Sequence, residues 1–216
     1  MSVESGVPAA PDPEEVLDFW FADATCSPEA ARRRVELWFQ ASVTFDRQIA
    51  ERFGHLPDAA AGGALDAWKA EPRSALALVV VLDQFPRNAF RGTPRAFAFD
   101  GSARAVALAA LEAGFAERLH PLEAAFFGLP LEHAEDIPLQ HRCVAHYEWL
   151  RDRVPESFRE LFGEFVDYGR RHRDVIERFG RFPHRNAMFG RESTAEERDY
   201  LDAGGEKFDG LPPKTS

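Results

Sequence analysis

Cysteine and lysine are both scarce in this chain of 216 residues. The two cysteines, Cys26 and Cys143, show no paired spacing and no secretory signal precedes them, so we expect a reduced, cytoplasmic location. Only three of the 26 basic residues are lysines, and the others are arginines, whose planar guanidinium fits carboxylates and phosphates. Genome composition explains such a bias equally well, so the positions of the arginines matter more than their number.

Excess positive charge and long apolar runs are also missing. The net charge is −10 and no basic tail is present, which argues against a nucleic-acid surface, where neutralising phosphates supplies most of the affinity. The same acidity disfavours an anionic membrane, and the longest apolar run, residues 75–82, is too short to span a bilayer. We therefore expect neither nucleic acid nor membrane as a partner.

Helix-terminal signals recur along the chain and predict an all-α protein with no β-sheet. Ser27 followed by Pro28 predicts the start of a helix that runs to about Phe53 and ends at Gly54. Thr194 with Glu197 forms a capping-box pattern that predicts a late helix to about residue 203. The other main helices are expected at residues 16–22, 73–85, 94–114 with a possible break near 100–102, 138–154 and 156–179.

The segment 73–85 is apolar nearly all round, so a buried strand would also explain it. No second strand-like run exists for it to pair with, and we expect a central buried helix. Helices joined by short Pro/Gly turns predict an α/α superhelix of antiparallel, tetratricopeptide-like helix pairs, although the tetratricopeptide consensus is absent. One helical domain is expected at residues 13–203, between flexible tails at 1–12 and 204–216.

Four motifs follow one another along the chain. They read LDQFPRN at 82–88, AFA at 96–98 followed by Asp100, LPLEHAED at 129–136, and RFGRFPHRN at 178–186. Together they resemble an uncharacterised bacterial family, one of the numbered domains of unknown function, over roughly residues 16–201. The resemblance implies a tetratricopeptide-like helical fold but no chemistry. The family usually has a serine where this chain has Ala134, so no role for that hydroxyl is carried over.

A Phe-Pro-Arg-Asn-like phrase occurs twice, at 85–90 and 182–188, and the acidic cluster 131–136 lies between the copies. We expect the three segments to meet in one polar pocket. Asp83 follows an apolar helical run near its C-terminal end, where an acid is disfavoured and needs a cationic partner such as Arg87. One interpretation of this pair is a buried brace between the two halves of the chain.

Residues 178–185, which lead into the second copy of the phrase, carry four cations within eight residues, and these need anions. Internal carboxylates at Glu132, Glu135, Asp136 and Asp83 would make the cluster structural. An external carboxylate or phosphate, held by a guanidinium left unpaired, would make it a binding site. Both outcomes stay open. The four cations are Arg178, Arg181, His184 and Arg185.

Two further interpretations concern the histidines and asparagines. His133 lies among acids that should favour its protonated form, and His133 with Glu135 is the candidate pair for proton transfer. The spacing of the histidines and acids favours no metal site, and His172 lies in an apolar stripe that indicates a core residue. Asn88 and Asn186 suit turns that need left-handed backbone or a cap.

The first function hypothesis is a site for a small anionic ligand, a carboxylate or a phosphate, with general acid–base catalysis as a possible extension and no cofactor. The alternative is a tetratricopeptide-like scaffold for a protein or peptide partner, with the polar motifs purely structural. A metal-dependent hydrolase is the third hypothesis. Besides the candidate catalytic pair, the predicted ligand-binding residues are Asp83, Arg87, Asn88, Glu132, Asp136, Arg178, Arg181, His184, Arg185 and Asn186.

Overall fold

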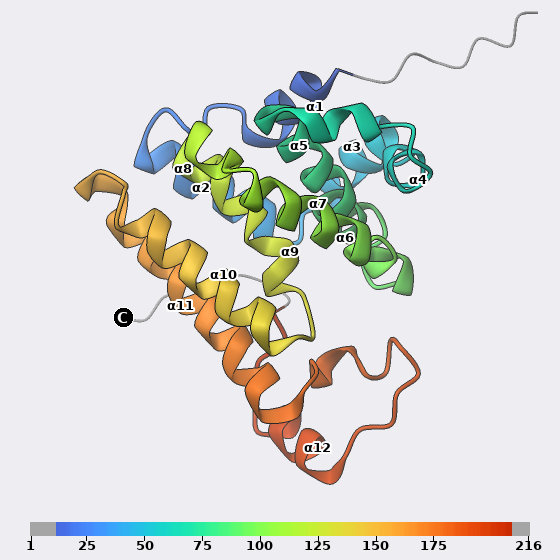
Figure 1. Cartoon of the computed structure of the whole chain (residues 1–216). Helices are drawn as coiled ribbons and strands as arrows, with labels where there is room; N and C mark the ends of the chain where they lie inside the picture. The colour runs from blue at the N-terminus through green and yellow to red at the C-terminus, as the bar shows by residue number, and fades with distance from the viewer. Residues whose placement is uncertain (1–11, 209–216) are drawn as a thin grey trace, which may run out of the picture.

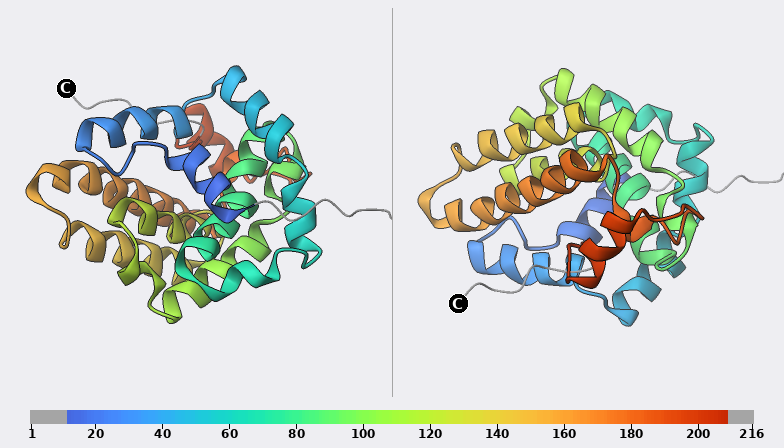
Figure 2. Two further views of the ribbon diagram at one scale, coloured as in Figure 1. Left: turned by 90° about the horizontal axis from the view of Figure 1, so that it is seen from above. Right: turned by 90° about the horizontal axis from the view of Figure 1, so that it is seen from below.

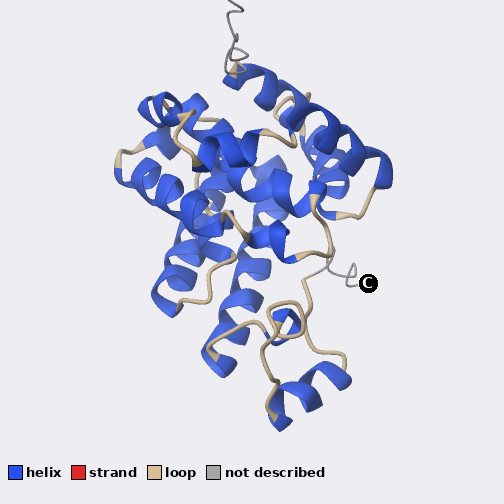
Figure 3. Ribbon diagram, turned by 90° about the vertical axis from the view of Figure 1, so that its right-hand side faces the viewer, coloured by secondary structure: helices blue, strands red, loops and turns tan. Residues whose placement is uncertain are grey.

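The computed structural model describes residues 12–208, and these contain helices and loops but no β-strand (Figure 3). The predicted all-α fold is thus confirmed over the described residues, whereas the superhelical arrangement of helix pairs stays a prediction. No helix within this part combines the length and apolar character needed to cross a membrane. The α-helices are α1 Pro13–Phe21, α2 Pro28–Phe39, α3 Val43–Phe53, α4 Leu56–Ala61, α5 Pro72–Val79, α6 Phe85–Ala89, α7 Asp100–Glu112, α8 Pro121–Ala124, α9 Leu129–Glu132, α10 Ile137–Arg151, α11 Glu156–Phe179 and α12 Ala195–Asp202.

Shorter helical turns connect these helices. They are the 3-10 turns η1 Asp66–Ala70, η3 Pro94–Phe97, η4 Phe115–Arg118, η5 Ala125–Phe127 and η6 Pro183–Arg185, and the π-helical turn η2 Val80–Gln84.

Helix starts follow local chemistry. Ser27 accepts a hydrogen bond from the backbone N–H of Ala30, as its N-cap position predicts. Thr194 and Glu197 form the predicted capping box of α12. The single helix expected from Ser27 to Phe53 is wrong, because the backbone is extended at Gln40 and Ser42 caps a new helix, α3.

The central segment is helical and buried, as predicted, but it contains a π turn that the sequence pattern does not reveal. The backbone N–H of Phe85 bonds to the carbonyl of Val80, five residues back. A proline inside a helix removes one donor and clashes with the carbonyl four residues earlier, so the wider turn before Pro86 relieves that conflict. Asp83 lies in this turn and is fully buried.

Large aromatic side chains pack against the aliphatic residues of the main core. Trp20 stacks on Trp38 with ring centroids 5.7 Å apart, and Phe126 meets the Trp38 ring edge-on at 4.8 Å. A second, smaller cluster contains Val175, Ile176 and Phe182 and lies at the end of α11. Figure 1 and Figure 2 show α10 and α11 side by side along their length, with the loop from η6 to α12 beyond the C-terminal end of α11.

The last described residues lie against α11. Phe208 stacks on His172 with ring centroids 3.5 Å apart, and Glu206 pairs with Arg171. His172 is 1% exposed, which confirms its predicted place in the core. Of the predicted tails, residues 1–11 and 209–216 lie outside the described part of the chain.

Candidate functional site

Asp83 is the centre of a buried polar cluster. Its Oδ1 lies 2.9 Å from Nδ1 of His133 and 3.2 Å from Nη1 of Arg87, and the Gln84 amide donates to its Oδ2. Burial alone would raise the pKa of Asp83, but the charge of Arg87 and the contact with His133 bring it down to about 2. Asp83 is therefore an ionised carboxylate enclosed by donors.

Arg87 has carboxylate partners on both sides. Besides Asp83, it donates two hydrogen bonds to Asp100 at the start of α7, at 2.9 and 3.1 Å. Its Nη1 also donates to the carbonyl oxygen of Asp83 at 2.9 Å. Although burial opposes its charge, the two acids raise the pKa of Arg87. Arg87 is thus the cationic partner expected for Asp83, but Asp83, Arg87 and Asp100 all belong to the first half of the chain, so this pair does not itself link the two halves. Asp100 belongs to one of the four motifs but was not among the predicted site residues.

Arg185, from η6, differs from every other arginine of the motifs. It is 6% exposed, and its Nη1 donates to the backbone oxygen of His133 at 2.9 Å. Its guanidinium lies between two rings, 4.3 Å from the centroid of Phe182 and 5.0 Å from that of Phe97. Within residues 12–208 it has no ion pair, and its Nε is buried without a hydrogen-bond partner. Burial and the nearby charge of Arg87 lower the pKa of Arg185 to about 10.

His133 is oriented by Asp83 and stays partly accessible, with 13% of its side chain exposed. The expectation that neighbouring acids favour its protonated form is wrong, because burial and the charge of Arg87 lower the pKa of His133. Glu135 binds Arg191 instead of His133, with Nη1–Oε2 at 2.6 Å. The ionised Asp83 can only accept, so Nδ1 carries the proton and Nε2 keeps its lone pair.

Glu132 precedes His133 in the chain and is 1% exposed. Its Oε1 is buried without a hydrogen-bond partner, 3.8 Å from Nδ1 of His172. Burial and the negative charge of Asp83 raise the pKa of Glu132 to about 8. Glu132 is thus a neutral acid at pH 7, next to a carboxylate that is ionised far below that pH.

Three predicted acidic or amide residues are held by other partners. Glu135 accepts from the backbone N–H of Phe182 at 2.8 Å in addition to its pair with Arg191. Asp136 caps α10 by accepting from the N–H of Leu139. Asn88 donates to Asp46 at 2.8 Å. Arg191, the partner of Glu135, was not among the predicted site residues, because it lies in a loop after the last motif.

Among the remaining predicted residues, Arg178, Arg181 and Asn186 contact acids of α12. Arg178 pairs with Glu196 at 2.9 Å on the surface. Arg181 pairs with Glu197 at 2.6 Å, and Asn186 donates to the same carboxylate. His184 has a buried Nδ1 without a partner, and burial with the charge of Arg185 lowers its pKa to about 3.

The structure thus brings together five of the predicted residues, from three separate segments: Asp83, Arg87, Glu132, His133 and Arg185. Phe97 and Asp100 complete this group, which we call the Arg185 site. Among the described residues, no group of three or more His, Cys, Asp or Glu side chains is arranged to hold a metal ion.

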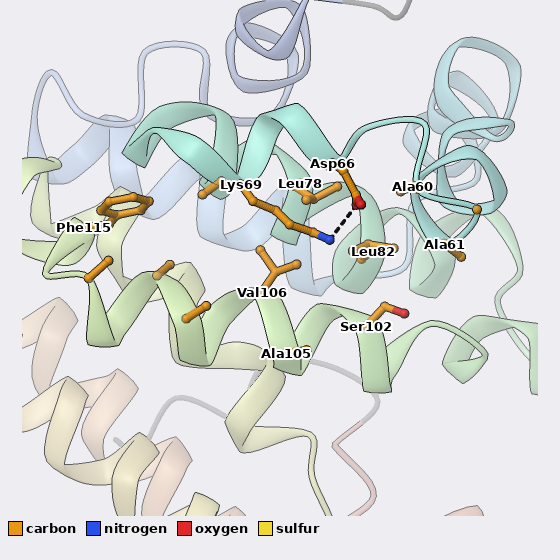
Figure 4. Close-up of a pocket in the computed structure, with 16 residues that line it drawn as sticks. Ala60, Ala61, Asp66, Lys69, Leu78, Leu82, Ser102, Ala105, Val106 and Phe115 are labelled. Atoms are coloured by element: carbon orange, nitrogen blue, oxygen red, sulfur yellow. Dashed lines mark hydrogen bonds and ion pairs between the residues drawn. The ribbon is translucent and has the colours of Figure 1, made fainter.

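A separate groove of about 630 Å³ lies between α7 and the segment from α4 to α5 (Figure 4). Its α7 wall is made of short side chains, including Ala105 and Ala109, together with Val106. Lys69 and Asp66 form an ion pair at 2.5 Å beside it. None of the predicted site residues lines this groove.

The sequence profile of a family described as bacterial protein of unknown function (DUF924) matches residues 16–205. A solved structure of a protein of unknown function from Agrobacterium tumefaciens is similar to this chain, with 38% identity and a TM-score of 0.74. The match covers 89% of this chain and 97% of that one. No curated protein matches the sequence.

Proposed function

The chain belongs to the bacterial DUF924 family of unknown function, and from the geometry of its polar cluster we propose that it binds a small anionic ligand at Arg185. The observation that carries the proposal is that Arg185, a residue 6% exposed, has no carboxylate partner for its guanidinium among residues 12–208. Arg87, Arg178 and Arg181 each have an acid as partner.

An unpaired buried cation is costly. Removing one partner from a buried pair costs about 3–5 kcal/mol, because the remaining charge is desolvated and uncompensated. The contacts of Arg185 soften this cost only partly, since it has one carbonyl acceptor and two aromatic faces. An incoming carboxylate or phosphate would supply the missing counter-charge for the guanidinium.

His133 gives the bound anion a neighbour that can accept a proton. Asp83 holds the Nδ1–H of His133, which leaves the Nε2 lone pair available as a general base. Asp83 acts here as a positioning residue. Glu135 takes no part in this proposal, because Arg191 holds both of its oxygens, at 2.6 and 2.9 Å.

The test is a thermal-shift titration with inorganic phosphate and with acetate on the wild type, Arg185→Gln and Arg178→Gln. Arg178 is the matched control, because it belongs to the same motif but pairs with Glu196 at the surface. At 100 times the Kd the ligand stabilises by about 2.7 kcal/mol, which raises Tm by roughly 5–10 °C for a chain of this size. The wild type and Arg178→Gln should shift alike and Arg185→Gln should not. An equal shift in all three contradicts the proposal.

The groove of Figure 4 favours a second candidate, a scaffold for a protein or peptide partner. Its lining of short side chains leaves room for apolar groups of a partner. Ala109→Trp would fill this space. Loss of a captured partner in Ala109→Trp, with the partner retained in Arg185→Gln, would support the scaffold; retention in both variants would exclude this groove as its docking place.

A further inference from the structure

The ring of Phe97 connects the Arg185 site to Phe189, an exposed aromatic side chain. Phe97 lies 5.0 Å from Cζ of Arg185, 5.4 Å from Cζ of Arg87, and 5.4 Å from the ring of Phe189. The rings of Phe97 and Phe189 meet edge-on, at an interplanar angle of 72°. A continuous aromatic surface therefore runs from the unpaired guanidinium to solvent.

Phe189 is unusual in its exposure. Among the described residues only Val43 and Phe189 are large hydrophobic side chains that are largely exposed, at 77% and 41%. Single exposed hydrophobic residues need no explanation, and Val43 has none. Phe189 is different because its ring contacts Phe97, and the Phe97 ring in turn lies against the unpaired guanidinium of Arg185.

The loop holds Phe189 in a fixed relation to Arg185. The backbone N–H of Phe189 donates to the carbonyl of Arg185 at 3.1 Å, and that of Arg191 donates to the carbonyl of Asn186 at 2.8 Å. Gly190, at φ +63°, provides the left-handed residue that this turn needs. Arg191 also lies over the Phe189 ring, with Cζ 5.2 Å from the centroid, while Glu135 anchors its guanidinium.

The charges around Arg185 determine whether a ligand with one or with two negative charges is favoured. Arg87 and Arg191 already have carboxylate partners, and Arg185 is the one unpaired guanidinium of the site within residues 12–208. Asp83 and Asp100 add negative charge close to it. The carboxylates of Asp83 and Asp100 balance the guanidinium charges of Arg87 and Arg185, so the site as a whole is neutral, and it would repel a dianion more strongly than a monoanion.

We infer that the ligand of the Arg185 site is a small aromatic monocarboxylate, whose carboxylate binds Arg185 and whose ring packs on Phe97 and Phe189. The inference rests on the proposed anion site and adds the class of its ligand. Aromatic pairs and the apolar area that they bury favour the ring over solvent, so phenylacetate should bind about tenfold more tightly than acetate.

Calorimetric titrations with acetate, phenylacetate and phenyl phosphate test this on the wild type, Phe189→Ser, Phe189→Leu and Val43→Ser. Val43→Ser is the matched control, since it also removes an exposed apolar side chain. We expect phenylacetate to be preferred in the wild type and in Val43→Ser. The preference should fall about tenfold in Phe189→Ser and less in Phe189→Leu, while the affinity for acetate stays within about twofold.

Three results would overturn the inference: equal affinity for acetate and phenylacetate, an unchanged preference in Phe189→Ser, or tighter binding of phenyl phosphate than of phenylacetate. Arg185→Gln separates this inference from the proposed function. If Arg185→Gln binds every anion as the wild type does, the anion site itself is wrong. If Arg185→Gln loses them all while Phe189→Ser keeps the preference, only the aromatic class is wrong.

Discussion

Replacing Glu132 by glutamine should stabilise the protein near neutral pH, because the folded state must hold a proton that the unfolded chain has lost. The ordinary pKa of the carboxyl is 4.5, and burial beside Asp83 raises the pKa of Glu132 to about 8 in the folded protein. The stabilising contribution of this proton is fully present below pH 4.5 and is lost as pH rises to 8. Glutamine has nearly the same shape and no charge to suppress.

The size of the expected stabilisation follows from the difference between the pH of the assay and the pKa of Glu132 in the unfolded chain. At about 1.4 kcal/mol per pH unit, holding the proton at pH 7 costs about 3 kcal/mol. Glu132→Gln should therefore raise the free energy of unfolding by up to about 3 kcal/mol at pH 7 and by little at pH 4.5. For a chain of this size, that corresponds to a rise in Tm of roughly 6–12 °C.

Urea denaturation at pH 5, 6, 7 and 8 measures the effect. The matched control is Glu123→Gln, since Glu123 is also buried but pairs with Arg73 at 3.0 Å. We expect the control to be less stable than the wild type at pH 7, and the gain of Glu132→Gln to grow steadily from pH 5 to pH 8. Parallel pH profiles for wild type and Glu132→Gln would refute the assignment of a neutral Glu132.

Three other substitutions test the buried cluster and the packing around it. Asp83→Asn should destabilise the folded protein by about 3–5 kcal/mol, because the ion pair of Asp83 is lost. The nitrogen NMR shifts of His133 should also report loss of the Nδ1–H tautomer. An unchanged tautomer would contradict the positioning role of Asp83. In urea denaturation, Gly128→Ala should lower the free energy of unfolding by about 1–3 kcal/mol, because its Cβ would lie 2.5 Å from Cε1 of Tyr147. Gly163→Ala has open space around its Cβ and should raise the free energy of unfolding by about 0.5–1 kcal/mol. Changes of the same sign in both variants would contradict the packing argument.

Helix termini were predictable because their signals are local. Ser27, the Thr194–Glu197 box and Gly180 act within four residues of the chain, so the pattern alone identifies them. The break at Gln40 was not predictable, since the apolar stripe continues past it and only the cap at Ser42 marks the new start. The π turn was not predictable for a related reason. The segment is buried on all sides, so the pattern of apolar and polar residues does not reveal a change in helical turn there.

The candidate site was predictable as a region but not as a set of pairs. The sequence indicated that the four cations of residues 178–185 need anions, and two of them, Arg178 and Arg181, have an acid as partner. Which acid serves which arginine depends on long-range contacts, such as that of Arg181 with Glu197 from α12. Arg191, the partner of Glu135, likewise comes from a loop outside the motifs. Charge counting therefore located the cluster, and only the packing of Phe97 and Phe182 around Arg185 identified the arginine without an acid.

The physical cost of that arginine is the argument for a ligand. Arg185 lies between aromatic rings beside a second guanidinium, an environment that lowers its pKa to about 10 and opposes its charge. A side chain needed only to brace η6 against α9 would be better as methionine or leucine, which fill the same space without desolvating a cation. The one direct hydrogen bond, to the backbone oxygen of His133, contributes about 1.5–3 kcal/mol, no more than the price of burying the charge. The anion that we propose for Arg185 would make this balance favourable, because it would supply the direct counter-charge that the site residues leave out.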